Sequence, residues 1–515
     1  MRSPRERLWD ALCWAAVLPV LLLPISNPDL FWHLTAASRI VSTGSIPRYD
    51  VLSFSRLGAA WVDFEWLTQL TYLGLYTAMG WGGLLFLKAS LLALCAAGVW
   101  VLAGLFDKGA PRRLLLLLWA CASTVRSELK PELLSVFLFT VELWALESFR
   151  LGALRVPSPG KAALASLLFF AAWANLHMGF PAGLALLAAY ALGTGERRPL
   201  LAAMSAGAAG TLLNPYGPGI YSVLADHWRW GRMLSSLIQE WSRPPWSGPL
   251  YAPFFLVCLL LPACWAFRWR RAGMPPVQHL AAVALFGPPC FFARRQAAYF
   301  IPLAMLVLAE SASSLPDWRP RPRQAAALAG AVLYAGWLWL FVFPRLAERR
   351  AFDARPYPEA AAAFIERNLD ALGHRRMFNE WDWGGYLGFR FAPDLRVFMD
   401  GRYLFHPLLA ESVDAYATPQ AWQAFLDRYG VEWALVRNDP QPIDVVERLG
   451  PGSLRRSKAP HFIAYMPPYR WALVHKDRLS LLFVRRGALP DRWVARQEGL
   501  CVGRGQPARA SRERK

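Results

Sequence analysis

The sequence predicts a mainly α-helical, polytopic membrane bundle of about eleven spans, followed by a smaller α/β domain outside the membrane. Hydrophobic residues make up 55% of the 515 residues and charged residues only 18%, whereas soluble chains carry about 25% charge. Apolar runs long enough to cross a bilayer recur through the first two-thirds of the chain. The 25 Trp and 30 Phe suit the aromatic belts at membrane–water boundaries. Together these features exclude secreted, cytosolic, fibrous and disordered proteins.

The spans are predicted from the apolar runs. The first run follows a basic start and lacks a small-residue cleavage site, so we interpret it as an uncleaved helix rather than a signal peptide. The predicted spans lie near 9–26, 82–106, 113–126, 131–147, 162–177, 180–195, 199–215, 251–267, 277–292, 296–313 and 324–344.

The distribution of Lys and Arg predicts the orientation. With the N-terminus in the cytoplasm, every short and strongly basic loop falls on the inner side, as the positive-inside rule requires. Eleven spans then place the segment after Pro344 outside. The net charge of +20 is explained by these loops, so we expect no nucleic-acid partner. The seven Cys show no CxxC or Cys/His spacing, which indicates neither a zinc site nor a disulfide framework.

The predicted domains are a membrane domain over 1–344, a periplasmic α/β domain over 345–500 and a basic, disordered tail over 501–515. In the second domain we expect a helix from Pro358 to about Leu372, closed by Gly373. The expected strands are Leu395–Met399, Val431–Val436 and a hairpin formed by Trp471–His475 and Leu479–Val484.

Residues 27–81 predict a first external loop with two juxtamembrane helices. Asn27 is a good N-cap and Pro28 suits the first helical position. Asp29 and His33 are then four residues apart on one helical face. Gly44 and Pro47 should end this helix.

The second juxtamembrane helix is expected to begin after Asp63 and to run to Met79, where Gly80 should stop it. Its apolar side chains indicate a helix that lies on the membrane surface.

Several motifs together identify a family resemblance. They resemble the C-type superfamily of membrane glycosyltransferases (GT-C), in a bacterial branch with a periplasmic C-terminal domain. The motifs are Asp29-Leu30-Phe31-Trp32-His33-Leu34, Val62-Asp63-Phe64-Glu65-Trp66-Leu67, Trp173-Ala174-Asn175-Leu176-His177, Leu213-Asn214-Pro215-Tyr216-Gly217, Phe378-Asn379-Glu380-Trp381-Asp382-Trp383-Gly384-Gly385-Tyr386-Leu387 and Val397-Phe398-Met399-Asp400-Gly401-Arg402.

The resemblance implies a membrane enzyme that takes a sugar from a polyprenyl-phosphate carrier. The acceptor would be a lipid, glycan or protein on the outer face of a bacterial inner membrane. In the superfamily the acid of the first loop acts as catalytic base or organises a divalent cation, Mg²⁺ or Mn²⁺. Asp29 matches that position. Several relatives have two adjacent acids where this sequence has Asp29-Leu30.

Each remaining acid or histidine of the first loop has a functional and a structural interpretation. Asp29 is the candidate catalytic residue and candidate metal ligand, but it also suits the positive end of a helix dipole. His33 could bind phosphate or a sugar hydroxyl, or form an ordinary hydrogen bond. Asp63 and Glu65 are candidate second acids, although Asp63 favours the role of N-cap.

Four cations are predicted to bind the carrier phosphate, because Arg grips phosphate in a bidentate manner. The alternative is snorkelling of these side chains at span ends. They are Arg126, Lys130, Arg294 and Arg295.

Six polar or aromatic residues are predicted to contact the acceptor or a sugar ring. Asn175 and His177 could instead satisfy carbonyls at a helix end. Asp400-Gly401-Arg402 could contact carbohydrate or form an ordinary turn. The six are Asn175, His177, Asn379, Trp381, Trp383 and Tyr386.

Two other classes of function compete with the enzyme. A glycolipid transporter or flippase usually carries intramembrane charges or two repeated halves, whereas the conspicuous charges here are expected at the outer rim. A non-catalytic scaffold for envelope assembly is the third class. Asp29→Asn should separate these classes, since only the enzyme depends on that carboxylate.

Overall fold

The computed structural model describes residues 3–106, 110–193, 195, 197–313, 320–439, 442–450 and 453–503. The chain forms two compact units. The helical unit comprises Met1–Asn27 and Val62–Asp353, and the α/β unit comprises Pro28–Trp61 and Ala354–Lys515. The predicted boundary at residue 344 assigned 27–81 to the membrane domain. In the structure, 28–61 belongs instead to the α/β unit.

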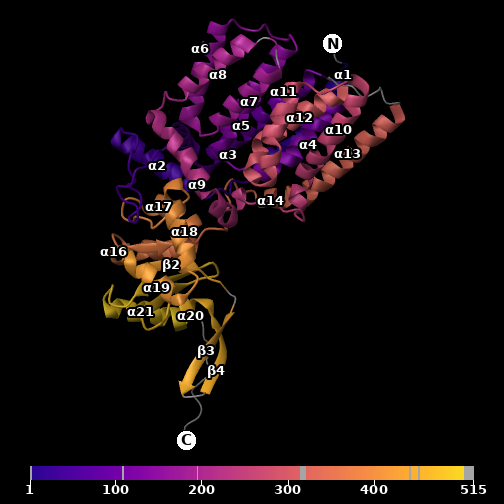
Figure 1. Ribbon diagram of the computed structural model, residues 1–515. Coiled ribbons are helices and arrows are strands. Elements are labelled where there is room, and N and C mark those ends of the chain that lie inside the picture. Colours follow the sequence, from indigo (N-terminus) through magenta and orange to yellow (C-terminus); the bar gives the residue numbers. More distant parts are fainter. Residues whose placement is uncertain are drawn as a thin grey trace. The chain divides into compact units, whose positions relative to one another are not determined.

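The helical unit confirms the mainly α-helical fold class, because a helix lies at each of the eleven predicted apolar segments (Figure 1). Among these, α4 packs against α3, α10 and α12. The eleven helices are α1 (Pro4–Leu21), α3 (Trp66–Gly104), α4 (Ala110–Ser123), α5 (Glu132–Arg150), α6 (Pro159–Leu176), α7 (Phe180–Gly193), α8 (Arg197–Gly210), α10 (Ala252–Ala272), α11 (Val277–Phe286), α12 (Ala297–Ser313) and α13 (Pro320–Phe341).

Two helices differ from their predicted bounds. α1 begins at Pro4, five residues earlier than predicted, because Ser3 and Glu6 form a capping box. α3 joins the second predicted juxtamembrane helix to the second predicted span. Its helical geometry breaks only at Gly80, which has φ 60° and ψ −147°. Glycine adopts this conformation without a Cβ penalty, so the predicted stop is present as a kink.

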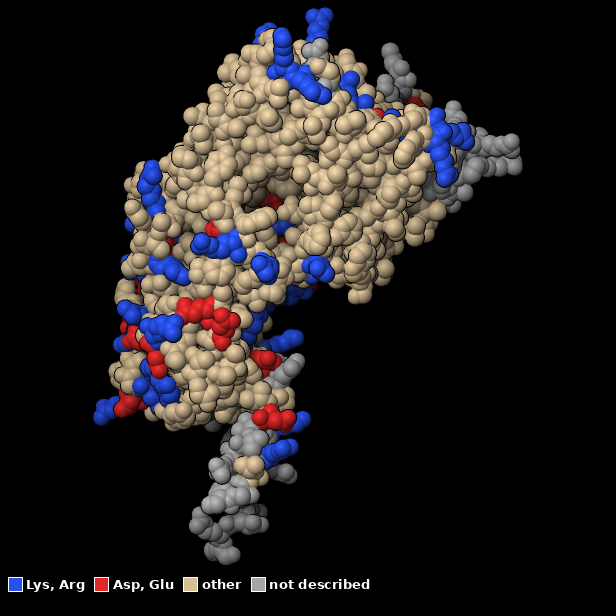
Figure 2. Space-filling view, viewed as in Figure 1, with Lys and Arg blue, Asp and Glu red and all other residues tan. Residues whose placement is uncertain are grey.

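Within the described residues, three helices are long and apolar enough to cross a membrane. They are Trp66–Gly104, Pro249–Ala272 and Arg294–Ser313, and shorter apolar helices occur at Phe180–Gly193, Val277–Phe291 and Ala329–Phe341. Figure 2 shows that one broad face of the helical unit carries almost no charged side chains, with Lys and Arg gathered at its two ends. The chain is therefore a membrane protein, as predicted.

Shorter segments connect these helices. The loop after α8 leads through a 3₁₀ turn at Gly217–Ile220 into α9 (Tyr221–Leu237). Further 3₁₀ turns lie at Thr124–Arg126, Gln239–Trp241, Pro249–Tyr251, Pro288–Phe291 and Arg294–Gln296, and α14 spans Phe343–Leu346.

The α/β unit contains a four-stranded sheet of order β1-β2-β6-β5. β1 (Met377–Asn379) pairs parallel to β2 (Trp433–Arg437), and β6 (Ser480–Arg485) pairs antiparallel to both β2 and β5 (Trp471–Lys476). The predicted hairpin is thereby confirmed. A second antiparallel pair, β3 (Pro442–Gly450) and β4 (Ser453–Pro460), was not predicted.

The helices of the α/β unit confirm its mixed class. The predicted helix from Pro358 to Leu372 is split at Asn368 into α15 (Glu359–Arg367) and α16 (Leu369–Leu372). The predicted strand Leu395–Met399 is wrong: only Val397 forms an isolated bridge, with Ser53. Residues 504–515 of the predicted disordered tail lie outside the described residues. The other helices are α2 (Asp29–Thr43), α17 (Trp381–Phe391), the 3₁₀ turn Tyr403–Phe405, α18 (His406–Ala415), α19 (Pro419–Arg428), α20 (His461–Tyr465) and α21 (Asp491–Gly503).

α2 belongs to this unit because its apolar face packs on α17. Phe31 on α2 lies edge-on to Tyr386 on α17 and to Tyr357, with ring centroids 5.2 Å and 5.0 Å away. These contacts bury the aromatic face of α2 against residues that lie more than three hundred positions later in the sequence.

Candidate functional site

Ionic side chains at the start of α5 form the first candidate site, which we call the open cluster: Arg126, Lys130, Glu132, Glu240 and Arg295. Arg126 forms an ion pair with Glu132, the first residue of α5. Its guanidinium also lies 3.6 Å from Glu240, and Lys130 Nζ lies 2.6 Å from the same carboxylate. Arg295 is 3.8 Å from Glu132 and 3.8 Å from Glu240.

The open cluster borders a cavity of about 190 Å³. Arg294 also lines it and lies over the ring of Tyr251, 5.4 Å from its centroid. All four cations predicted to bind phosphate therefore meet around one cavity or its border. The cavity is smaller than the roughly 300–1,000 Å³ of drug-sized ligand pockets, which suits a head group. It is lined by Val125, Arg126, Glu128, Lys130, Glu132, Leu133, Val136, Gln239, Glu240, Tyr251 and Arg294.

The carboxylates of the open cluster were not predicted. Burial opposes ionisation of Glu240, but the charges of Lys130, Arg295 and Arg126 outweigh it and hold the pKa of Glu240 below its usual value. The cluster thus keeps its negative charges as well as its cations. An anion that enters the cavity has to compete with Glu132 and Glu240 for these cations.

A second group of predicted residues lies around His177, which follows the last residue of α6. Its Nδ1 lies 2.7 Å from the Ser135 hydroxyl, and its Nε2 lies 3.7 Å from Glu65. The structure therefore brings His177 and Glu65 together. Asn175 donates to the carbonyls of Ala171 and Leu213, both at 2.8 Å. This is the structural alternative that the sequence left open for Asn175.

Two predicted N-caps are wrong. Asp63 is buried and accepts from the Gln69 amide at 2.5 Å, while Glu65 occupies the cap position of α3. Asn27 donates instead to the Leu129 carbonyl at 2.9 Å, and α2 begins at Asp29 without a side-chain cap. Asn27 therefore bonds a distant residue, and Asp63 bonds a side chain within the first turns of α3, in place of the predicted capping.

Asp29 and His33 lie on α2 in the α/β unit. Asp29 is half-buried, whereas His33 is buried. Gly401 faces the carboxylate of Asp29: a Cβ added at Gly401 would collide with Asp29 Oδ1 and would lie 3.3 Å from Trp32 Nε1. The predicted catalytic acid therefore contacts the Asp400-Gly401-Arg402 motif.

Arg402 centres a buried ionic group, which we call the Arg402 cluster: Asp50, Asp400 and Arg402. The guanidinium lies 2.7 Å from Asp50 and 2.8 Å from Asp400, and all three side chains are at most 3% exposed. Burial raises the pKa of Asp400, although Arg402 opposes the rise. Trp61 stacks on the guanidinium at 4.5 Å. This motif is therefore more than an ordinary turn.

The aromatic motif around α17 is largely internal. Trp383 is fully buried and donates to the Pro356 carbonyl at 3.0 Å, and Tyr386 is 3% exposed. Asn379 is buried and bonds the backbone of Met399 and Phe398, both at 2.8 Å. These three side chains are thus engaged inside the α/β unit, and their contact with a sugar stays a prediction. Trp381 is half-buried and stacks near His406.

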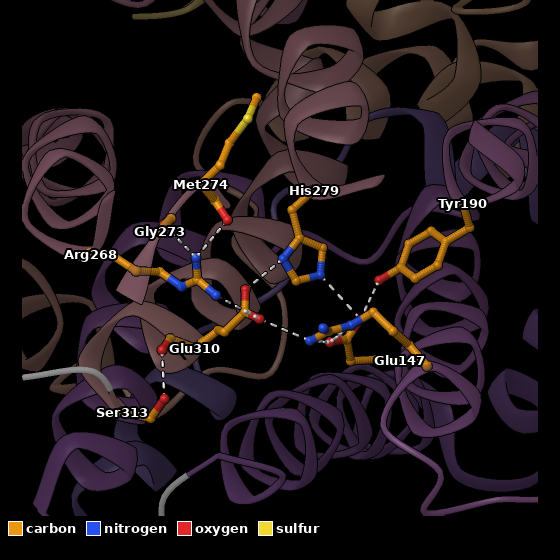
Figure 3. A network of polar contacts seen from close by, with 9 residues as sticks. Glu147, Tyr190, Arg268, Gly273, Met274, His279, Glu310 and Ser313 are labelled. Carbon is orange, nitrogen blue, oxygen red and sulfur yellow. Dashed lines mark hydrogen bonds and ion pairs between the residues drawn. The ribbon is translucent and has the colours of Figure 1, made fainter. Parts of the chain in front are cut away.

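A second ionic group in the helical unit, which we call the closed cluster, was not predicted: Glu147, Arg150, Arg268, His279 and Glu310. Figure 3 shows Glu310 and Glu147 on either side of the His279 ring. His279 is fully buried, with Nδ1 2.9 Å from Glu310 and Nε2 3.1 Å from Glu147. These side chains were not among the conspicuous charges expected to cluster at the outer rim. The i,i+3 pair of Glu147 and Arg150 was the available sequence signal.

No group of three or more His, Cys, Asp and Glu side chains that could hold a metal ion occurs among the residues that the structure describes.

The fold of this chain is similar to that of solved membrane-protein structures. The chain superimposes on the archaeal oligosaccharyltransferase AglB from Archaeoglobus fulgidus, in complex with an inhibitory peptide and a dolichol-phosphate, with a TM-score of 0.58 at 11% identity. The alignment covers 84% of this chain and 70% of that one. An Archaeoglobus fulgidus oligosaccharyltransferase tethered to an acceptor peptide gives a TM-score of 0.55 at 11% identity, and the alignment covers 83% of this chain and 68% of that one.

ArnT from Cupriavidus metallidurans bound to undecaprenyl phosphate gives a TM-score of 0.49 at 12% identity, covering 94% of this chain and 98% of that one. No family model and no curated protein matches the sequence. The likeness to the oligosaccharyltransferase is one of fold, and it supports the expected class of a helical membrane bundle with a smaller α/β domain.

Proposed function

We propose that this chain is a glycosyltransferase that moves a sugar from a polyprenyl-phosphate carrier to a lipid, glycan or protein on the outer face of a bacterial inner membrane. The observation that carries the proposal is the cavity in the helical unit, which is lined by Arg126, Lys130 and Arg294. Arg295 lies 3.8 Å from the lining carboxylates Glu132 and Glu240. A carrier phosphate needs cations that stay charged, and Arg side chains do so throughout the physiological range.

The fold supports the same substrate class. The structure of the similar oligosaccharyltransferase holds a dolichol-phosphate, which is a polyprenyl-phosphate lipid. The membrane helices of this chain would accommodate the lipid tail, and the open cluster would neutralise the phosphate as it leaves.

Asp29 is the proposed general base. It accepts the proton of the acceptor hydroxyl while that oxygen bonds to the anomeric carbon of the sugar. The bond between the anomeric carbon and the phosphate oxygen breaks, and the polyprenyl phosphate leaves with the bond's electron pair. A carboxylate can perform this role without a metal ion, and the proposal uses only that role.

The proposed topology has a cytoplasmic N-terminus and a periplasmic C-terminal unit. α5 supports this orientation, because it begins with Glu132 of the open cluster and ends at Arg150, next to a loop predicted to be cytoplasmic. Reporter fusions near residues 155 and 270 should report the cytoplasm, and one near 430 the periplasm. A cytoplasmic report at 430 would overturn the topology.

Asp29→Asn tests the base. We expect transfer to fall by at least about 100-fold, since removal of a general base costs about 10²–10⁴ in rate. The measurement is mass spectrometry of envelope glycans from a deletion strain that carries each variant. Asp394→Asn, at an exposed site of the same unit, is the matched control and should leave transfer unchanged. Near-normal transfer by Asp29→Asn would refute the proposed base.

A glycolipid transporter is the second candidate, and one observation favours it. Lys88 and Glu142 are buried inside the helical unit, and intramembrane charges often mark transport pathways. A transporter would leave the sugar composition of the glycolipid unchanged in the deletion strain and would tolerate Asp29→Asn. Loss of one sugar from the glycan separates the enzyme from the transporter.

A further inference from the structure

Gly401 lies directly against the carboxylate of Asp29. A Cβ built on Gly401 would overlap Asp29 Oδ1, with Asp29 Cγ and Trp32 Nε1 both 3.3 Å away. Gly401 has no positive φ, so its backbone conformation does not by itself call for glycine. The close approach of Asp29 is the reason that this position needs a residue without a side chain.

The backbone of Gly401 is held on both sides by buried groups. Asp400 and Arg402 belong to the Arg402 cluster, and Asp400 accepts from the Arg402 backbone N–H at 3.0 Å. Arg402 also reaches Asp50, 2.7 Å away on the segment that follows α2. Because a buried ion pair is costly to disrupt, Gly401 cannot shift easily away from Asp29.

The Asp29 side of the contact is fixed as well. Trp32, one helical turn further along α2, packs with Trp61 and Ala36 in a small apolar cluster that also contacts Tyr403 and Leu404. Trp61 in turn stacks on the Arg402 guanidinium. The segment 29–61, which carries Asp29, therefore contacts the loop that carries Gly401 through Trp32, Asp50 and Trp61.

We infer that Gly401 is a positioning residue for Asp29: its bare backbone forms the wall that fixes where the Asp29 carboxylate points. The inference rests on the proposed role of Asp29 as catalytic base. It assigns a catalytic purpose to the Asp400-Gly401-Arg402 motif, with Gly401 as the wall and the Arg402 cluster as its support. Gly401 itself makes no contact with the substrate.

Gly401→Ala in the full-length protein is the test. The added methyl group has to push the Asp29 carboxylate aside, and a displacement of about 1 Å costs on the order of 100-fold in rate. We expect kcat for transfer to fall by about 100-fold while KM for the carrier stays within about twofold. The assay uses membranes of the deletion strain as acceptor and undecaprenyl-phosphate-linked sugars extracted from the parent strain as donor.

Gly388→Ala is the matched control. Gly388 lies on α17 in the same unit, and a Cβ there would meet only Val397 Cγ1 at 3.5 Å, an ordinary contact. This variant should keep both kcat and KM. An equal loss of kcat in Gly388→Ala and Gly401→Ala would overturn the inference, since the effect would then not depend on Asp29.

A second measurement separates positioning from a simple fault in folding and needs no substrate. Gly401→Ala should lower the Tm of the purified protein by about 2–4 °C when Asp29 is present, as overpacking commonly does. In the Asp29→Ala background the same substitution should change Tm by less than about 1 °C, because the colliding carboxylate is gone. Equal losses in both backgrounds would overturn the inference.

The activities of Asp29→Asn and Gly401→Ala distinguish a failure of the proposed base from a failure of the positioning role. If Asp29→Asn transfers sugar normally, the base assignment fails whatever Gly401→Ala does. If Asp29→Asn is inactive and Gly401→Ala is as active as the wild type, the base assignment stands and the positioning role of Gly401 fails.

Discussion

The two ends of α5 and of the α12 segment carry two ionic clusters with opposite properties. At one end, Glu132 on α5 and Arg295, just before α12, belong to the open cluster beside a cavity of about 190 Å³. At the other end, Glu147 on α5 and Glu310 on α12 hold His279 between them in the closed cluster. Both clusters contain Arg and Glu, and each includes one Glu of α5.

The difference lies in what the charges face. In the closed cluster both ring nitrogens of His279 lie within hydrogen-bond distance of a carboxylate. This arrangement needs two protons on three groups, so the ring is an imidazolium or one Glu is protonated. Tyr190 donates to Glu147 at 2.7 Å and completes the network. The closed cluster thus links α5, α7, α11 and α12, whereas the cations of the open cluster lie beside a cavity. Buried charge alone is therefore a weak indicator of a binding site.

The largest effect is expected from breaking the closed cluster. His279→Ala leaves Glu147 and Glu310 without their shared partner, and removing one partner of a buried ionic pair costs about 3–5 kcal/mol. Thermal unfolding in detergent measures this loss. His227→Ala removes a ring that bonds the Val223 carbonyl and stacks on Trp241 but pairs with no carboxylate in these contacts, and it should cost less than half as much. Transfer per folded molecule should stay within twofold, and a larger loss would show that the closed cluster also takes part in transfer.

Breaking the open cluster should affect transfer instead. Arg126→Gln removes a cation at the cavity, and we expect transfer to fall by about 100-fold, or about 2.7 kcal/mol, as for loss of one preorganised donor to a developing anion. Arg268→Gln in the closed cluster is the matched control, since Arg268 donates hydrogen bonds to the Gly273 and Met274 carbonyls. Equal activity of the two variants would remove the functional distinction between the clusters.

A milder change sharpens the same comparison. Arg126→Lys keeps the charge but loses the fork that grips two phosphate oxygens. We expect transfer to fall by about tenfold, measured in the same membranes. Lys130→Arg should stay within about threefold of wild type. A larger loss for Lys130→Arg than for Arg126→Lys would assign the phosphate contact to Lys130.

The smallest effect concerns pH. The pKa of Glu240 is held below its usual value, so its contribution to stability is present above the unfolded value of about 4.3 and is lost only as pH falls through the lower folded value. The difference in Tm between wild type and Glu240→Gln should therefore stay constant from pH 8 to pH 5.5. A difference that shrinks by pH 6 would show that Glu240 titrates near neutrality and that its cations are already engaged elsewhere.

Much of the helical unit could be predicted, because eleven of its helices coincide with the predicted apolar runs, although α9 does not. The four cations were predictable for a similar reason: they flank apolar segments and so stand out in the sequence. Their carboxylate partners were not. Glu240 lies 110 residues from Lys130, and no local pattern links the two. His279 and Glu310 lie inside apolar segments, where a single ionisable residue is a signal of buried pairing.

In the α/β unit, the features that the sequence did not predict have a different physical cause. Composition cannot separate an aromatic residue that offers its face to a sugar from one that packs in a core, and Trp383 and Tyr386 are of the second kind. β1 has only three residues and pairs with β2 more than fifty residues away, so it has no period of its own. Asp29 could be selected by the family resemblance, but its contact with Gly401 depends on tertiary folding.

The α/β unit is assembled from two separate stretches of the chain, and this has a consequence for biosynthesis. Residues 28–61 belong to a unit whose remainder begins at Ala354, so the ribosome makes the 292 residues 62–353 between the two parts. At roughly 5–20 residues per second, that interval lasts roughly 15–60 s. Throughout it, Trp32 and Trp61 lack the Tyr403 and Leu404 side chains that later cover them. The nascent first loop is therefore a natural client for a chaperone or a target for a protease. Truncation before residue 354 would leave Trp32 and Trp61 permanently uncovered.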